Sequence, residues 1–173
     1  MVMKKIFYCY ILICILITSC AKKGSVMGTF TDDDMVLVLD GNTYYFGDDA
    51  SKLLDFLGEP QEVTEILSCY HEGYDKTYIY DKVEVTTFPK DGKDILDEVI
   101  FYSDTYSFKG GVTVGSSKDD IIKAYGDKYF VEDDAMLYNK TSDNSDKQSP
   151  RLTFILKNDK VIAIDFFSNS YFS

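Results

Sequence analysis

The side chains best suited to nucleophilic chemistry, Cys69 and His71, lie two positions apart. His71 is the only histidine of the chain, so no second imidazole is present to activate another cysteine or serine. On a strand the two side chains would share a face. Thiol catalysis also needs a group that orients the imidazole and a site that stabilises the oxyanion, and nothing nearby supplies them. We therefore expect Cys69 to be a small packed hydrophobic residue and the protein not to be an enzyme.

As metal ligands, the same pair supplies only half of a structural zinc site, and Glu72 or Asp75 would have to complete it through folding. Clusters of aspartate offer oxygen ligands for calcium, but none follows the twelve-residue calcium loop with its central glycine and terminal glutamate. These clusters are Asp32 to Asp34, Asp48 with Asp49, Asp133 with Asp134, and Asp143 with Asp146. We expect them to lie in solvated loops, with a single weak calcium site as the alternative. We expect no cofactor.

The acidic balance of the chain excludes one class of partner. The 29 Asp and Glu residues outnumber the 18 Lys and Arg residues, so the formal charge is −11, and it becomes −13 without the two lysines of residues 1–20. Such a chain repels the phosphates of nucleic acid instead of neutralising them. We therefore expect no nucleic-acid partner.

The first 20 residues have the charged, apolar and small-residue regions of a membrane-targeting segment, in the usual order. Two lysines precede an apolar run over residues 6–17, and Ser19 precedes Cys20. As a helix, this run would cover about 18 Å of a hydrocarbon core that is about 30 Å thick. The run is therefore too short for a permanent span.

This arrangement resembles the signal of a bacterial lipoprotein. The resemblance implies a signal peptide over residues 1–20, cleaved before Cys20, and a diacylglyceryl group on the Cys20 sulfur. The chain would then be anchored on the extracytoplasmic face of the bacterial membrane. Cys69 would be its only free thiol, so no internal disulfide is expected. The alternatives are an ordinary cleaved secretory peptide and an uncleaved membrane helix.

Two short helices are predicted about 68 positions apart, over 51–58 and 119–126. Each has apolar residues at positions i, i+1 and i+4, followed by a glycine that suits a helix cap. Ser116 or Ser117 can cap the second helix. Segments rich in β-branched and aromatic residues favour strands. These strands are 36–39, 43–46, 77–80, 83–88, 99–102, 136–138, 152–156 and 161–167.

A helix followed by antiparallel strands, twice over, predicts an α+β fold with helices on one face of the sheets. The two tandem repeats are residues 35–110 and 111–173, and residues 21–34 are predicted to form a flexible tether. This arrangement resembles the tandem fold of the β-lactamase inhibitor protein and the half-unit of lipoproteins of the SmpA/OmlA type. In such a fold the opposite sheet face stays open.

Residues 67–126 carry a closer resemblance. A family of clostridial-type surface lipoproteins has similar strings, which here read Ser68-Cys-Tyr-His-Glu-Gly73, Asp75-Lys-Thr-Tyr-Ile-Tyr80, Asp91-Gly-Lys-Asp94 and Gly111-Val-Thr-Val-Gly-Ser-Ser-Lys-Asp-Asp-Ile-Ile122. The family has no assigned activity. The resemblance therefore implies the anchor and the fold, and it implies no catalytic residue.

Tyr78 and Tyr80 are the candidate binding residues. They alternate with Ile79, so either the tyrosine side or the Ile79 side of this strand meets the helices. Tyrosine offers a large contact area at a low entropic cost. If the tyrosine side is the open one, it would serve as a binding platform.

These observations predict a lipid-anchored, extracytoplasmic binding or interaction module without catalytic activity. Its partners would be the membrane, through the lipid on Cys20, and a protein of the envelope or a secreted protein. Inhibition of a secreted hydrolase and scaffolding of envelope proteins are two versions of this role. The alternative is an enzyme or solute binder that acts on envelope polymers through carboxylates, which spacing among 29 acidic residues does not identify. A third alternative is a purely structural role.

Overall fold

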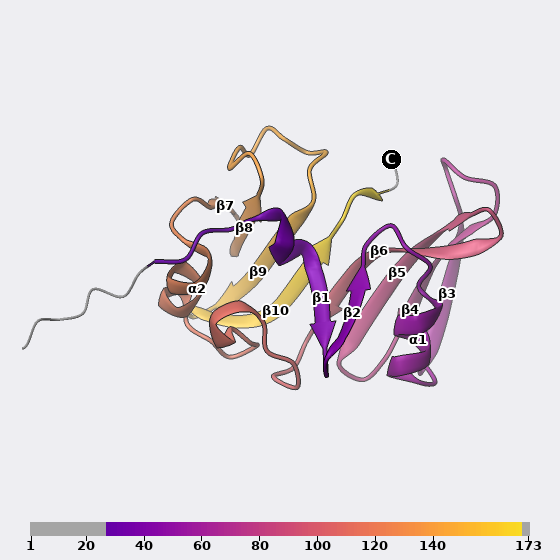
Figure 1. Ribbon diagram of the computed structural model, residues 1–173, viewed down its shortest axis with the longest axis horizontal. Helices are drawn as coiled ribbons and strands as arrows, with labels where there is room; N and C mark the ends of the chain where they lie inside the picture. Colours follow the sequence, from indigo (N-terminus) through magenta and orange to yellow (C-terminus); the bar gives the residue numbers. More distant parts are fainter. Residues whose placement is uncertain (1–26, 171–173) are drawn as a thin grey trace, which may run out of the picture.

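The computed structural model describes residues 27–170, and strands dominate it. Strands make up 43% of the structure and helices 16%. Eight strands form one antiparallel sheet in the order β3-β4-β5-β6-β10-β9-β8-β7. They are β3 (Glu62–Leu67), β4 (Tyr74–Ile79), β5 (Val83–Lys90), β6 (Lys93–Phe101), β7 (Phe130–Glu132), β8 (Ala135–Asn139), β9 (Arg151–Lys157) and β10 (Lys160–Phe167). Figure 1 shows β3 and β7 toward opposite ends of the long axis of the molecule.

A two-stranded hairpin and the helices lie in front of this sheet in Figure 1. The hairpin pairs β1 with β2, antiparallel to each other. These elements are η1 (Asp32–Met35), β1 (Val36–Leu39), β2 (Asn42–Tyr45), α1 (Ser51–Leu57), η2 (Lys109–Gly111) and α2 (Lys118–Tyr125). The helices and the hairpin thus cover one face of the sheet, and no described helix covers the other face.

One hydrophobic core runs along the covered face, because alternate residues of each strand point to it. Val99 of β6 lies opposite Val85 of β5 and opposite Phe166 of β10, and all three are buried. Leu53 of α1 and Ile121 of α2 belong to the same cluster. The two helices therefore share one core.

The predicted α+β fold of two tandem repeats, residues 35–110 and 111–173, is wrong. The structure is mostly β, and eight strands from both predicted repeats join in one sheet. The junction is the pair β6 and β10, where Phe101 lies opposite Ile164. Pairing these two strands satisfies the N–H and C=O groups that separate sheets would leave at their edges. It also places the apolar side chains of both strands in one core.

Tight turns close the β5–β6 and β9–β10 hairpins. Asp91 and Gly92, between β5 and β6, have φ values of 51° and 74°. Asn158 and Asp159, between β9 and β10, have φ values of 52° and 57°. Hairpin turns of this kind need positive φ at both central residues, which Asn, Asp and Gly adopt most readily.

The N-terminal segment packs against α2 from Gly28 onward. The Gly28 amide donates to the Lys123 carbonyl at 2.8 Å. A Cβ atom on Gly28 would lie 1.7 Å from the Ala124 carbonyl oxygen, so only glycine fits this contact. The chain thus enters the body beside α2, as Figure 1 shows.

Lys109 holds the same segment further along. Its Nζ donates to the Thr29 carbonyl at 2.6 Å and to Asp34 Oδ2 at 2.8 Å. The prediction of a flexible tether over residues 21–34 is therefore wrong for residues 28–34, because backbone and ion-pair contacts fasten them to the body.

The predicted signal peptide, residues 1–20, and the predicted lipidation site, Cys20, lie outside the described residues. Within residues 27–170, neither the α-helices nor the 3-10 helices are long and apolar enough to cross a bilayer.

Candidate functional site

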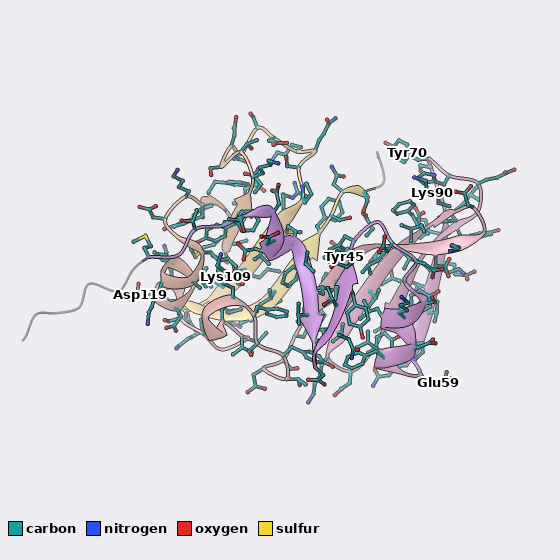
Figure 2. The ribbon with its side chains drawn as sticks, viewed as in Figure 1. Tyr45, Glu59, Tyr70, Lys90, Lys109 and Asp119 are labelled. Carbon is teal, nitrogen blue, oxygen red and sulfur yellow. The ribbon has the colours of Figure 1, made fainter. Side chains whose placement is uncertain are left out.

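Exposed apolar side chains gather where β3 turns into β4. Their exposed fractions range from 42% at Val63 to 68% at Leu67. We call this group the β3 patch; its members are Val63, Ile66, Leu67, Tyr70 and Tyr74. Figure 2 shows Tyr70 at the outer end of the β3–β4 loop. Exposed apolar side chains that gather on one part of a surface are typical of sites of interaction.

β3 is an edge strand whose six residues are all exposed, and its neighbour in the sheet is β4. The Ser68 amide donates to the Gly73 carbonyl at 3.0 Å. In an antiparallel pair, successive residues direct their N–H and C=O groups alternately toward and away from the neighbouring strand. Because Ser68 bonds toward the β4 side, the even-numbered residues of β3 direct their N–H and C=O groups toward β4. The N–H and C=O groups of Val63, Glu65 and Leu67 therefore point outward. The patch combines apolar side chains with an open row of backbone donors and acceptors.

Hydrogen bonds within the β3–β4 loop shape the end of the patch. Ser68 Oγ accepts from the Tyr70 amide at 3.4 Å and from the His71 amide at 3.2 Å. The His71 ring stacks on the Phe88 ring, with centroids 4.9 Å apart. Cys69 is exposed, so the expectation that it is a packed hydrophobic residue is wrong. Both residues lie in a loop, where the alternation of a strand does not place their side chains together.

Tyr78 and Tyr80, the predicted binding residues, face the covered side of the sheet. Tyr78 lies opposite the buried Val85, and both tyrosines pack against the core cluster. Tyr78 OH donates to Asp94 Oδ2 at 2.8 Å, and burial together with this bond raises the pKa of Tyr78. Of the two alternatives that the sequence left open, the tyrosine side of β4 is thus the one that meets the core, and the Ile79 side is the open one. The condition for a tyrosine-lined binding platform on the open face is therefore not met.

The open face carries carboxylates on three neighbouring strands. Glu84 of β5 lies opposite Ile100, and so does Asp165 of β10, while Glu98 is two residues away from Ile100 on β6. Burial, and then the charge of Glu98, raises the pKa of Asp165 to about 8. Burial also raises the pKa of Glu98, and the hydrogen bond from Thr86 opposes that rise. The sheet thus holds an acid that stays protonated near neutral pH.

A separate feature of the structure is a cavity beside the β1–β2 hairpin. Its volume is about 480 Å³, and Glu98 and Asp165 are not among its lining residues. It is lined by Met35, Tyr45, Phe46, Gln148, Pro150, Ser168, Asn169 and Ser170. General acid–base chemistry on a polymer needs two carboxyl groups flanking the bond in a cleft.

Three aspartates of the predicted clusters make ion pairs or hydrogen bonds with other side chains. Asp32 pairs with Lys140 at 2.8 Å and Asp34 with Lys109 at 2.8 Å. Asp146 accepts from Ser149 in its own loop. Within residues 27–170, no group of three or more His, Cys, Asp or Glu side chains is placed to hold a metal ion. The expectation of solvated loops is wrong for Asp34, whose side chain is 9% exposed.

The sequence did not predict β3 itself. Glu62–Leu67 follows Pro60 and contains three β-branched residues, which is a strand signal. Its apolar residues do not alternate, because all six side chains of this strand are exposed among the described residues. The pattern that identifies a half-buried strand is therefore missing at this edge.

Neither a protein-family model nor a curated protein sequence matches this chain. Two solved structures are similar to it at a distance. One is an extracellular protein containing an SCP domain from Bacillus anthracis, at 12% identity and a TM-score of 0.44, over 71% of this chain and 44% of that one. The other is a cysteine-rich secretory protein from Staphylococcus aureus, at 12% identity and a TM-score of 0.42, over 71% of this chain and 43% of that one. This chain spans less than half of either structure, so we argue its function from its own residues.

Proposed function

We propose that this protein is a lipid-anchored, extracytoplasmic binding module without catalytic activity, and that it binds a protein of the cell envelope through the β3 patch. The observation that carries this proposal is the exposed edge strand β3, with its apolar side chains and outward backbone groups. A surface of this composition on a chain of net charge −11 is suited to a protein partner and unsuited to nucleic acid.

The α2 side, where the described chain begins, and β3 lie toward opposite ends of the long axis of the molecule. Only residues 21–26 separate Cys20 from the described chain, and seven residue steps reach about 25 Å at full extension. The described chain enters the body beside α2, as Figure 1 shows. A lipid on Cys20 would hold the α2 end near the membrane and turn the β3 patch toward the envelope.

The enzyme alternative has less support. Its best candidates are Glu98 and Asp165, which share the open face and have raised pKa values. They lie on a sheet face and do not line the cavity beside the β1–β2 hairpin. A binding role needs no such cleft, because an edge strand binds through its backbone and flanking side chains.

The anchor is tested by comparing two cysteine variants in membrane fractions. We expect Cys20→Ser to release the protein from the membrane and Cys69→Ser to leave it bound, because the lipid is attached to Cys20. Mass spectrometry of the membrane-extracted wild-type protein should find a diacylglyceryl group on Cys20. An unmodified Cys20 in this material would overturn the anchor.

The binding surface is tested by chemical crosslinking on intact cells, followed by mass spectrometry. We expect wild-type protein to crosslink to an envelope protein and Leu67→Glu to lose at least nine-tenths of the product. Val131→Glu, at the other edge of the sheet, is the matched control and should retain it, since Val131 is similarly exposed at 55%. Equal crosslinking by wild type and Leu67→Glu would overturn the proposal.

A further inference from the structure

We propose that the outer edge of β3 takes an extended segment of the partner protein as an additional strand, and that this segment carries apolar residues together with lysine or arginine. This inference rests on the proposed binding function and names the chemistry of the partner. It is argued from the backbone geometry, the side chains and the charges of β3.

The backbone of β3 has N–H and C=O groups that can pair with one more strand. The amide and carbonyl groups of Val63, Glu65 and Leu67 point away from β4, as the bond from Ser68 to Gly73 sets the alternation of the ladder. Three outward residues are enough for a short strand pairing. Within residues 27–170, β4 is the neighbour of β3 in the sheet, and the other side of β3 has none. Main-chain hydrogen bonds to such an edge provide affinity, and alternate side chains provide specificity.

The side chains of β3 offer apolar contact on both faces of the sheet. Val63 lies opposite Tyr78, which places it on the helix-covered face, and Leu67 shares that face. Ile66 lies opposite Asp75 on the other face. All three are exposed. An added strand would therefore find apolar neighbours for side chains on both of its own faces.

The charges of β3 select a basic partner. β3 carries Glu62 and Glu65 and has no lysine or arginine. Lys76, directly opposite Glu65 on β4, pairs with Asp94 at 3.0 Å. Opposite charges across neighbouring strands are stabilising and like charges are destabilising. Glu62 lies on the open face and Glu65 on the helix-covered face, so a segment with lysine or arginine next to either of them is favoured for this reason.

The same charges disfavour a second copy of this chain as the occupant. Pairing β3 with β3 of another copy would bring together Glu62 and Glu65 from both chains. Each chain also has a formal charge of −11. Long-range repulsion would slow the encounter and local repulsion would weaken the pair. A basic segment from another protein meets neither obstacle.

The test uses the full-length chain and two synthetic hexapeptides, one alternating lysine and valine and the other alternating glutamate and valine. Binding is measured by fluorescence anisotropy, and amide protection is measured by hydrogen exchange with NMR detection. We expect the lysine–valine peptide to bind and to slow exchange at Val63, Glu65 and Leu67. We expect at least tenfold weaker binding of the glutamate–valine peptide. Protection that appears elsewhere and not at these amides would overturn the inference.

A pair of variants separates the backbone from the side chain. Glu65→Pro removes an outward N–H group without removing a bond to β4, and proline is tolerated at such edge positions. Glu65→Ala removes the same side chain and keeps the N–H group. We expect Glu65→Pro to bind the peptide at least tenfold more weakly than Glu65→Ala. Equal binding by the two variants would overturn strand addition.

A modified peptide checks the same point without altering the protein. N-methylation of all the backbone amides removes the backbone donors from the lysine–valine peptide and keeps its charge. We expect at least a tenfold loss of binding, and no loss would overturn strand addition.

The crosslinking experiment separates this inference from the proposed function. If Leu67→Glu abolishes the envelope crosslink and Glu65→Pro does not, the binding surface stands and strand addition fails. If neither variant affects the crosslink, both proposals fail. A wild-type dimer in sedimentation analysis that Glu65→Pro dissociates would overturn the basic segment, because the occupant would be a second copy.

Discussion

The two edge strands of the sheet, β7 and β3, differ in length and exposure. β7 is three residues long, and Val131 is its one exposed residue. Its last residue, Glu132, pairs with Lys147 at 2.6 Å. β3 is six residues long and wholly exposed, and it carries most of the β3 patch. The β7 end also receives the N-terminal segment beside α2, whereas the β3 end projects away from it (Figure 1).

This difference indicates which edge is available for binding. A long exposed apolar edge is a template for pairing with other chains, and proteins usually shorten it, charge it or cover it. β7 is short and has an ion pair beside it. β3 is kept long and apolar, with Glu62 and Glu65 as its only charges. We interpret the two glutamates as protection against self-pairing that leaves the edge open to a basic partner.

The largest expected effect separates the centre of the sheet from its open edge. Phe166 is 1% exposed and contacts the rings of Phe101 and Phe108 where β6 meets β10. We expect Phe166→Ala to lower the free energy of unfolding by about 3–5 kcal/mol, through lost burial and a cavity. Ile66→Ala in β3 should change it by less than about 0.5 kcal/mol. Urea unfolding measures both, and a large loss in Ile66→Ala would show that β3 is kept for stability.

The second expected effect concerns the α2 end of the molecule, where the N-terminal segment docks. A Cβ atom on Gly28 would collide with the Ala124 carbonyl, so we expect Gly28→Ala to cost about 2 kcal/mol. Thr29→Ala, at an exposed neighbouring side chain, is the control and should be nearly neutral. Thermal unfolding and limited proteolysis measure the change. Unaltered stability of Gly28→Ala would contradict the close contact with α2.

The third effect is a pH dependence at the middle of the open face. The pKa of Asp165 is raised to about 8 by burial, above its ordinary value of 3.8. The folded state therefore binds a proton more tightly than the unfolded state does. The stability that this proton contributes is fully present below pH 4 and is lost as the pH rises toward 8.

We expect the free energy of unfolding of the wild type, relative to Asp165→Asn, to fall by about 1 kcal/mol per pH unit between pH 5 and 7. Asn cannot ionise, so the variant lacks this part of the slope. Glu65→Gln on the exposed β3 is the control and should follow the wild type. Parallel curves for wild type and Asp165→Asn from urea unfolding would contradict the raised pKa.

The smallest effect is expected at β7. Lys147→Ala removes the ion pair with Glu132, whose partners are largely exposed, and should change stability by less than about 0.5 kcal/mol. It should also not create binding of the lysine–valine peptide, because β7 remains only three residues long. Peptide binding at β7 in this variant would show that the ion pair, and not strand length, closes this edge.

Local elements of the fold were predictable because their signals are local. The first predicted helix, over 51–58, corresponds to α1 with Gly58 as its cap. The second corresponds to α2, where Ser117 Oγ accepts from the Asp120 amide at 3.2 Å. Capping residues and positive-φ turns act within a few positions of the chain. The candidate site was not predicted, because an edge strand with no covered face has no burial pattern.

By itself, the sequence determined the two helices, most strands and the turns, since hydrogen bonding and side-chain conformation between near neighbours are enough to specify them. It also determined the acidic charge. Only the tertiary structure decided that β6 pairs with β10, that Tyr78 and Tyr80 face the core, and that residues 28–34 dock against the body. These outcomes depend on which apolar faces meet across long separations in the chain, and spacing along a sequence does not encode that choice.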